Sequence, residues 1–305
     1  MKRLHIVGCP RSGTTLLLEL LATCFEFDRR SRFDFSMFKA FDVTEGLLLS
    51  KQPTDILQLP ALLPHDPSLH AICIVRDPRA VIASKDTTTA GYCANYRIWK
   101  ACDNAARKLQ SHPRVLQIRY EDLVCHPDKV QQTIMRKFRF LVFRHFFSRF
   151  EKYAKPDAPA LQALNGLRAV EAGSIFKWQQ HLARIKAQLL LSPALQRDLE
   201  YHGYEDNADW QQMLAEVTPQ QFACHYSDTV SIPQELQQRV RLWFRIRQYT
   251  KRAQALKLQQ HLSDWSGPRY TTVPNREPIP MVAAIATAPH SVTRRQPLSR
   301  PAPPA

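Results

Sequence analysis

Residues 4–21, LHIVGCPRSGTTLLLELL, have the order of a strand, a short polar loop and a helix. The apolar run that begins at Leu4 ends at Gly8, and a leucine-rich run begins after Gly13. Glycines at this spacing are typical of a phosphate-binding loop, in which backbone N–H groups and a helix N-terminus hold the anion. An ordinary nucleoside-triphosphate loop has a lysine after the second glycine. Here Thr14 follows it, and Arg11 is the only cation of the loop.

The first 150 residues alternate between apolar, strand-like runs and helical stretches. We expect strands at 4–8, 46–51, 71–76 and 115–120, and helices at 14–25, 79–88, 95–110 and 128–149. Continuous apolar strands separated by helices indicate a parallel sheet that is covered on both faces. The pattern therefore predicts a three-layer α/β fold with a P-loop, followed by a helical C-terminal part.

Charge and proline content divide the 305 residues into three parts. We expect a P-loop domain over 1–215, a basic helical extension over 216–262 and a proline-rich disordered tail over 263–305. The net charge is +15, and residues 231–305 carry 12 Lys/Arg against 3 Asp/Glu, so nucleic-acid binding is not implied for the domain itself. The basic helix suits either a solvated or packed role or contact with an anionic membrane.

The cysteine pattern and the N-terminus both favour a cytoplasmic protein. The seven cysteines form no zinc-binding spacing, and Cys24 and Cys73 lie in apolar runs, which predicts buried, reduced thiols. The first apolar run is too short for a signal peptide, and no apolar stretch reaches the length of a membrane-spanning helix.

A second candidate site follows the third expected strand, where Arg76 ends the strand and Pro78 opens a helix. We expect Asp77 to cap that helix, Arg79 to be a surface cation and Ser84 to lie two turns along it. Ligands of doubly wound sheets bind at the carboxyl ends of strands, which places Arg76 beside the first loop. Two separate anion sites predict a ligand with two phosphate groups.

These two motifs resemble those of the P-loop sulfotransferases that use 3′-phosphoadenosine-5′-phosphosulfate (PAPS). The family's phosphosulfate loop has the form P-[KR]-S-G-T-T, and its 3′-phosphate motif has Arg and Ser eight residues apart, as Arg76 and Ser84 are. The first motif reads Pro10, Arg11, Ser12, Gly13, Thr14 and Thr15 in this chain.

The resemblance extends over about residues 4–210 and implies further cofactor-binding residues. It places Tyr120 near the adenine, Arg168 near the 3′-phosphate and Trp178 in a segment that closes over the nucleotide. The implied reaction is in-line transfer of the sulfuryl group to an acceptor hydroxyl or amine, which leaves adenosine 3′,5′-bisphosphate (PAP). Arg11 would stabilise the leaving phosphate without a required metal.

The acceptor side has several candidate residues. Some members of the family use a histidine near the position of Lys51, and others use a carboxylate after the first helix. We favour Asp34 as the general base, with Glu45 and Asp55 as rivals and Lys51 beside the sulfuryl group. The acceptor can be a small molecule, a carbohydrate or a lipid.

Residues 138–150 are dense in aromatic and cationic side chains. They predict a core helix with snorkelling arginines, or an apolar lining for the acceptor pocket. Two other functions compete with sulfuryl transfer: a P-loop nucleotide or small-molecule kinase, and a non-catalytic protein that binds anions or membranes.

Overall fold

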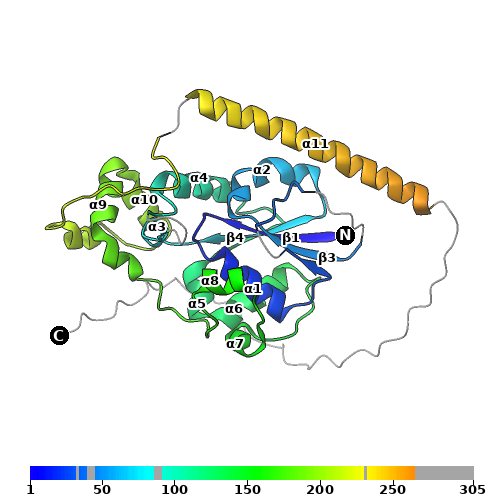
Figure 1. The fold of residues 1–305 in the computed structure, drawn as a ribbon, viewed down its shortest axis with the longest axis horizontal. Helices are drawn as coiled ribbons and strands as arrows, with labels where there is room; N and C mark the ends of the chain where they lie inside the picture. The colour runs from blue at the N-terminus through cyan, green and yellow to red at the C-terminus, as the bar shows by residue number, and fades with distance from the viewer. Residues whose placement is uncertain (32–33, 40–44, 86–90, 230–231, 265–305) are drawn as a thin grey trace.

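The computed structural model describes residues 1–264 except 32–33, 40–44, 86–90 and 230–231 (Figure 1). Its centre is a parallel sheet of five strands in the order β2-β3-β1-β4-β5. The strands are β1 (Lys2–Gly8), β2 (Arg29–Arg30), β3 (Leu47–Lys51), β4 (Leu69–Val75) and β5 (Val115–Arg119). The four strands expected from the apolar runs are all present, and β2 is an additional edge strand of two residues.

Helices cover both faces of the sheet, which confirms the predicted three-layer α/β fold (Figure 1). One layer contains α2 (Leu59–Leu62), α3 (Pro78–Ile82), α4 (Tyr96–Arg107), α9 (Leu182–Leu191) and α10 (Ala194–Tyr201). The other contains α1 (Thr14–Cys24), α5 (Tyr120–Cys125), α6 (Pro127–Lys137), α7 (Phe150–Tyr153) and α8 (Ala158–Leu164). Each layer has its own buried core against the sheet, and Cys73 and Cys24 are buried in these cores as predicted. The 3-10 helices are η1 (Pro53–Leu57), η2 (Leu63–His65), η3 (Phe147–Arg149), η4 (Lys177–His181) and η5 (Asp209–Leu214).

The helix expected over 79–88 is shorter than the prediction. It ends at Ile82, and Ser84 lies beyond it in an irregular turn, where the Ser84 carbonyl accepts a hydrogen bond from the Cys93 amide at 3.1 Å. This bond replaces the next helical bond and turns the chain. Residues 86–88 of the predicted helix lie outside the described residues.

The single helix predicted over 128–149 is also wrong, because α6 ends at Lys137. The chain from Phe138 onward runs irregularly across the C-terminus of α1, where the amides of Arg144 and His145 both reach the Cys24 carbonyl. The Gln131 side chain bonds the His145 carbonyl and the Phe147 amide. The segment therefore satisfies its backbone through α1 and α6 instead of through a helix of its own.

The basic extension forms α11 (Ile232–Asp264), a helix along the outside of the α2 layer (Figure 1). A helix was expected within the basic extension over 216–262, and residues 216–229 before α11 are not helical. The rest of the predicted disordered tail, from residue 265, lies outside the described residues. Among the helices that the structure describes, none has the length and apolar character needed to cross a bilayer.

A buried histidine joins β1 to the segment after β3. His5 Nδ1 lies 2.8 Å from Ser50 Oγ, and Nε2 lies 3.2 Å from Asp55 Oδ2. Because a carboxylate only accepts hydrogen bonds, the proton belongs on Nε2 and Nδ1 accepts from the serine. Complete burial lowers the pKa of His5, although Asp55 opposes that shift.

We expect this histidine to make the fold sensitive to acid. The unfolded chain binds a proton at the ordinary histidine pKa of about 6.5, whereas folded His5 binds it only at lower pH. The free energy of unfolding should therefore fall as the pH drops below about 6.5, by up to about 1.4 kcal/mol per pH unit for one such group. Urea unfolding at several pH values measures this slope. His5→Gln should flatten it, whereas His65→Gln, at an exposed position, should leave it as in the wild type. An unchanged slope in His5→Gln would contradict the assignment.

Candidate active site

The loop between β1 and α1 has a shape that only glycine permits at two positions. A side chain at Gly8 would lie 2.5 Å from the Ile74 carbonyl oxygen. Gly13 has a φ of +96°, and a Cβ there would lie 2.5 Å from the ring of Tyr120. The Ser12 hydroxyl donates to the Cys9 carbonyl at 2.6 Å, so this side chain shapes the loop from within. The loop thus leads directly into the N-terminus of α1, where the first backbone N–H groups have no partner within the helix. The first turn of α1 contains no acidic residue, so the N-terminus keeps its positive character.

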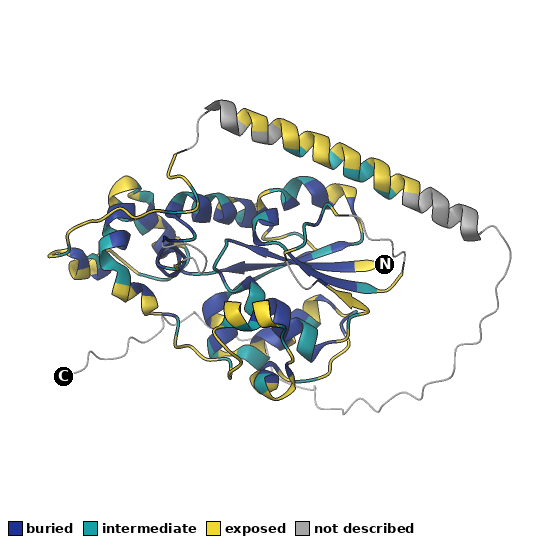
Figure 2. Ribbon diagram, viewed as in Figure 1, coloured by how far each residue is buried: buried dark blue, intermediate teal, exposed yellow. Residues whose placement is uncertain are grey.

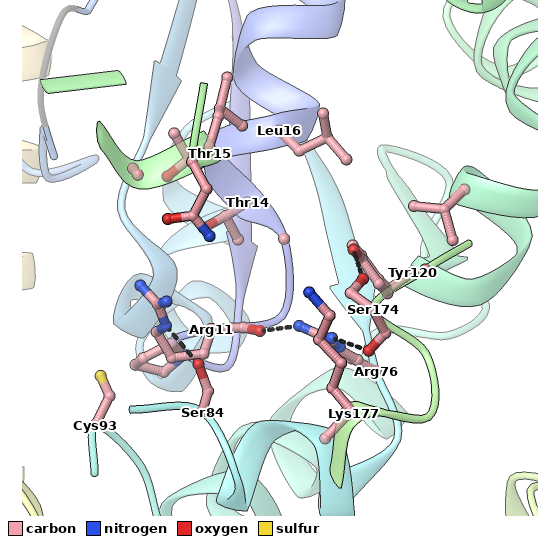
Figure 3. A pocket seen from close by; sticks show the side chains of 18 of the residues that line it. Arg11, Thr14, Thr15, Leu16, Arg76, Ser84, Cys93, Tyr120, Ser174 and Lys177 are labelled. Carbon is pink, nitrogen blue, oxygen red and sulfur yellow. Dashed lines mark hydrogen bonds between the residues drawn. The ribbon is translucent and has the colours of Figure 1, made fainter. Parts of the chain in front are cut away.

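Arg11 joins the loop to the second motif. Its backbone is left-handed, with a φ of +70°, an unusual conformation for a residue with a side chain. The Arg11 Nε donates to Ser84 Oγ at 2.8 Å, and the two terminal nitrogens point away from that serine (Figure 3). The two residues come from motifs 73 positions apart and meet in one site.

Arg76 lies at the end of β4, beside the loop (Figure 3). Its terminal nitrogens donate to the carbonyl of Arg11 at 3.0 Å and to that of Ser174 at 3.1 Å. The guanidinium carbon lies 4.1 Å from the centre of the Tyr120 ring, and the Tyr120 hydroxyl is 2.6 Å from Ser174 Oγ. Arg76 thereby ties the loop to the chain around residue 174. The Arg76 Nε is buried and has no hydrogen-bond partner within the described part of the chain.

Lys51 and Asp34 form a polar pair beside the loop. Lys51 is the last residue of β3, and its Nζ lies 2.5 Å from Asp34 Oδ1 and 3.1 Å from Thr15 Oγ1. The Lys51 side chain is buried, whereas the carboxylate-bearing side chain of Asp34 is 49% exposed. A buried cation thus holds an accessible carboxylate within reach of the first turn of α1.

These groups line one cavity of about 750 Å³. Every cofactor-binding or catalytic residue predicted above faces it except Ser12. Its lining includes Pro10, Arg11, Gly13, Thr14, Thr15, Asp34, Lys51, Arg76, Ser84, Tyr120, Arg168 and Trp178. Among the residues that the structure describes, six cations line the cavity against two carboxylates, which favours an anionic ligand. The cations are Arg11, Lys51, Arg76, Lys85, Arg168 and Lys177, and the carboxylates are Asp34 and Glu171.

The other two carboxylates considered as a base lie elsewhere. Glu45 is exposed in the turn before β3, where the Lys2 amide bonds the neighbouring Gly46 carbonyl, at the opposite edge of the sheet. Asp55 is buried, and its oxygens accept from His5, Ser36 and the Met37 amide. Neither residue lines the cavity.

Arg79 is a buried residue, so its prediction as a surface cation is wrong. Its guanidinium pairs with Asp77 at 2.7 Å and with Glu205 at 2.6 Å. The cation lies 4.0 Å from the centre of the Trp178 ring, which is itself buried. Asp77 caps α3 as predicted, because its side chain accepts from the Arg79 amide. The ion-pair network of Asp77, Arg79 and Glu205 therefore packs against the ring of Trp178.

Sequence reasoning did not single out several residues that line the cavity. They are Lys85, Cys93, Lys177 and His181, together with the apolar residues Leu16, Val124, Leu164 and Val170. Lys177 belongs to the segment with Trp178 that was expected to close over a nucleotide. His181 Nδ1 is 3.0 Å from the Tyr92 hydroxyl. Burial, with the charges of Lys85 and Arg184, lowers the pKa of His181.

Comparison with known proteins gives one family match. The model of the Sulfotransferase family matches residues 24–140. No curated protein matches the sequence.

Several solved structures resemble the chain distantly. The sulfotransferase domain from the curacin biosynthetic pathway is 17% identical with a TM-score of 0.42, and the match covers 67% of this chain and 98% of that domain. The sulfotransferase domain from the Synechococcus PCC 7002 olefin synthase is 20% identical, with a TM-score of 0.40 and coverages of 59% and 87%. The mouse sulfotransferase SULT7A1 complexed with PAP is 14% identical, with a TM-score of 0.42 and coverages of 70% and 88%. With TM-scores below 0.5, these likenesses support nothing further.

The matched segment begins at the last residue of α1 and includes Asp34, Lys51, Arg76, Ser84 and Tyr120. The loop between β1 and α1 precedes the matched segment in the chain and lines the same cavity. Residues 24–140 therefore match the model of the same family that the two motifs resemble.

Proposed function

We propose that the protein transfers a sulfuryl group from PAPS to an acceptor hydroxyl or amine. The main support for the proposal is that two candidate anion-binding sites lie in one positively charged cavity. The first is the N-terminus of α1 with Arg11, and the second is Arg76 with Ser84. The Arg11–Ser84 and Arg76–Arg11 hydrogen bonds hold the two sites together. A ligand with separate phosphate groups on one nucleoside matches this arrangement, and the cavity volume suits a molecule of that size.

The residues divide between the two ends of this ligand. The amides at the start of α1, with the hydroxyls of Thr14 and Thr15, suit the phosphosulfate. Arg76, Ser84 and Arg168 suit the 3′-phosphate, and the Nε of partly exposed Arg76 has no other hydrogen-bond partner among the described residues. The rings of Tyr120 and Trp178, which both line the cavity, would bound the space for the base.

Sulfuryl transfer breaks the S–O bond to the leaving phosphate and forms an S–O bond to an acceptor hydroxyl or an S–N bond to an acceptor amine. Negative charge grows on the phosphate oxygen as the old bond breaks, and the acceptor loses its proton. Arg11 uses its Nε for Ser84 and keeps its two terminal nitrogens for that growing charge. Preorganised donors of this kind stabilise a transition state without reorganisation of solvent.

Asp34 is the general base in this proposal. It is the only one of the three candidate carboxylates that lines the cavity, and its half-exposed oxygens can reach an incoming acceptor. Lys51 holds the carboxylate next to Thr15, and in this proposal its ammonium would lie beside the sulfuryl group. Proton transfer from the acceptor to Asp34 and bond formation to sulfur would occur together.

Part of the cavity lining is apolar, which favours an acceptor with an apolar part. Leu16, Phe150 and Leu164 face the cavity from α1, α7 and α8. Phe150 is the only residue of the aromatic segment 138–150 that does so, which limits the predicted apolar lining to its last residue. We therefore propose a small molecule or lipid with an apolar part as the acceptor, ahead of a carbohydrate.

Ligand-induced stabilisation separates this function from a kinase. We expect PAP to raise the melting temperature more than ATP with Mg²⁺, because the Arg76–Ser84 site binds a 3′-phosphate that ATP lacks. Differential scanning fluorimetry measures both shifts at equal ligand concentration. Adenosine 5′-monophosphate is the matched ligand control. A larger shift with ATP–Mg²⁺ would instead support the kinase.

Replacement of Arg11 should affect chemistry more than binding. We expect Arg11→Ala to lower kcat for transfer from PAPS by about 100-fold or more, the usual cost of removing a charge-stabilising donor. PAP binding, measured by calorimetry, should weaken far less because the α1 N-terminus and Arg76 remain. Arg11→Lys should recover part of kcat. If Arg11→Ala turns over PAPS as fast as the wild type, the role assigned to Arg11 is wrong.

Asp34→Asn tests the general base. The amide keeps the shape of the side chain and cannot accept the acceptor's proton, so we expect kcat to fall by about 100-fold or more. A more basic pH should restore part of the rate, because an ionised acceptor needs no base. Glu171→Gln is the matched control at the other cavity carboxylate and should keep its activity. Equal pH–rate profiles for Asp34→Asn and the wild type would place the base elsewhere.

A further inference from the structure

The two faces of α11 have different surroundings. On the inner face, Tyr249 contacts Arg3 and Asp66, and Arg245 contacts Gln58 and Ser36 of the domain. On the outer face, Leu236, Val240, Trp243 and Phe244 are exposed by 62%, 47%, 54% and 53%. Their spacing of four, three and one residues places them on one side of a helix. Figure 2 shows that the described residues of α11 are mostly exposed.

Cations surround this apolar stripe. The exposed side chains of Arg241, Arg247, Lys251 and Arg252 lie beside it or continue it along the helix, and the Arg247 guanidinium carbon is 5.2 Å from the centre of the Trp243 ring. The sequence from Leu236 to Ser263 contains seven Lys/Arg and no Asp or Glu. The outer face is therefore both apolar and uniformly positive.

We propose that this outer face binds the surface of a membrane that contains anionic lipids. A helix with an apolar stripe of Trp, Phe and aliphatic residues, flanked by cations, lies in the interfacial plane with the stripe among the acyl chains and the cations at the headgroups. No described helix is apolar enough to cross a bilayer, so α11 would lie on the surface. This binding is independent of the proposed sulfuryl transfer.

Two other occupants fit the face less well. A second copy of the chain would bring two helices together that each have seven cations and no acid over 236–263, and these like charges repel. A nucleic acid would match the charge and could stack on Trp243, but Leu236 and Val240 offer it no polar contact. Anionic lipid matches both the charge and the apolar stripe.

Vesicle co-sedimentation of the full-length protein tests the proposal. We expect binding to phosphatidylcholine vesicles that contain about a third phosphatidylserine, weakening with added salt, and little binding to phosphatidylcholine alone. Arg247→Glu with Lys251→Glu should weaken binding at least about tenfold, since each cation near the surface contributes to it. The matched control, Lys129→Glu with Arg136→Glu, makes the same change in net charge at exposed positions of α6, in the opposite layer, and should bind as the wild type does.

A second variant tests the apolar stripe. Trp243→Ser with Phe244→Ser keeps every charge and should also lose at least about tenfold in vesicle affinity. All the replaced side chains are exposed, so we expect the melting temperature and the transfer activity to be the same in all three variants as in the wild type. Equal binding by Arg247→Glu/Lys251→Glu and the control pair would overturn the proposal. So would wild-type binding only to single-stranded RNA, or a solution dimer that Trp243→Ser/Phe244→Ser converts to a monomer.

Discussion

Parallel pairing of β1 with both β3 and β4 is the constraint on which the rest of the site depends. In the observed register Ile6 stands between Lys51 and Ile72, and Gly8 stands beside Ile74. Three chain segments therefore leave the sheet at the same edge: the loop after Gly8, the segment that starts at Lys51 and the turn that starts at Arg76. Because all three strands run in one direction, the polar residues at their carboxyl ends lie close together, although nothing in the sequence around each residue indicates this contact. A shift of one residue in either pairing would turn Lys51 or Arg76 to the other side of the sheet.

At this edge of the sheet, close packing of the loop and Arg76 against Tyr120 determines the geometry of the site. The ring of Tyr120 occupies the space that a side chain at position 13 would need, and Arg76 stacks on the same ring. Arg76 also fixes the carbonyl of Arg11, which stands in a left-handed conformation. A non-glycine residue in that region is strained by about 1 kcal/mol or more, and the two hydrogen bonds of Arg11 with Arg76 and Ser84 offset that cost. The cation is thus held in position before any ligand arrives.

Sequence patterns predicted the elements that depend on neighbouring residues. They failed where contacts between residues far apart in the sequence determine the structure. Apolar runs located all four principal strands, because parallel strands that are buried on both faces consist of nearly continuous apolar residues. The segment 138–150 looked helical, yet the Cys24 carbonyl and Gln131 gave its backbone other partners. Charged side chains were the hardest to place. Arg79 is buried because it pairs with both Asp77 and Glu205, which is 126 positions away. The positions of Glu45 and Asp55 outside the cavity depend on strand pairing, which the sequence does not show.

The attachment of α11 follows from the same sheet. Tyr249 contacts Arg3 and Asp66 near the beginning of β1, whereas the phosphate loop follows its end. Gly8 is five residue steps along the strand from Arg3, which is about 17 Å at the usual rise. Although burial acts in the opposite direction, hydrogen bonds from Ser68 and Tyr249 and the charge of Arg3 lower the pKa of Asp66, so this carboxylate stays ionised and anchors the helix near neutral pH. The helix is therefore fixed at the edge of the sheet opposite the cavity, and its outer face can engage a partner while the Arg11–Ser84 site stays open to its ligands.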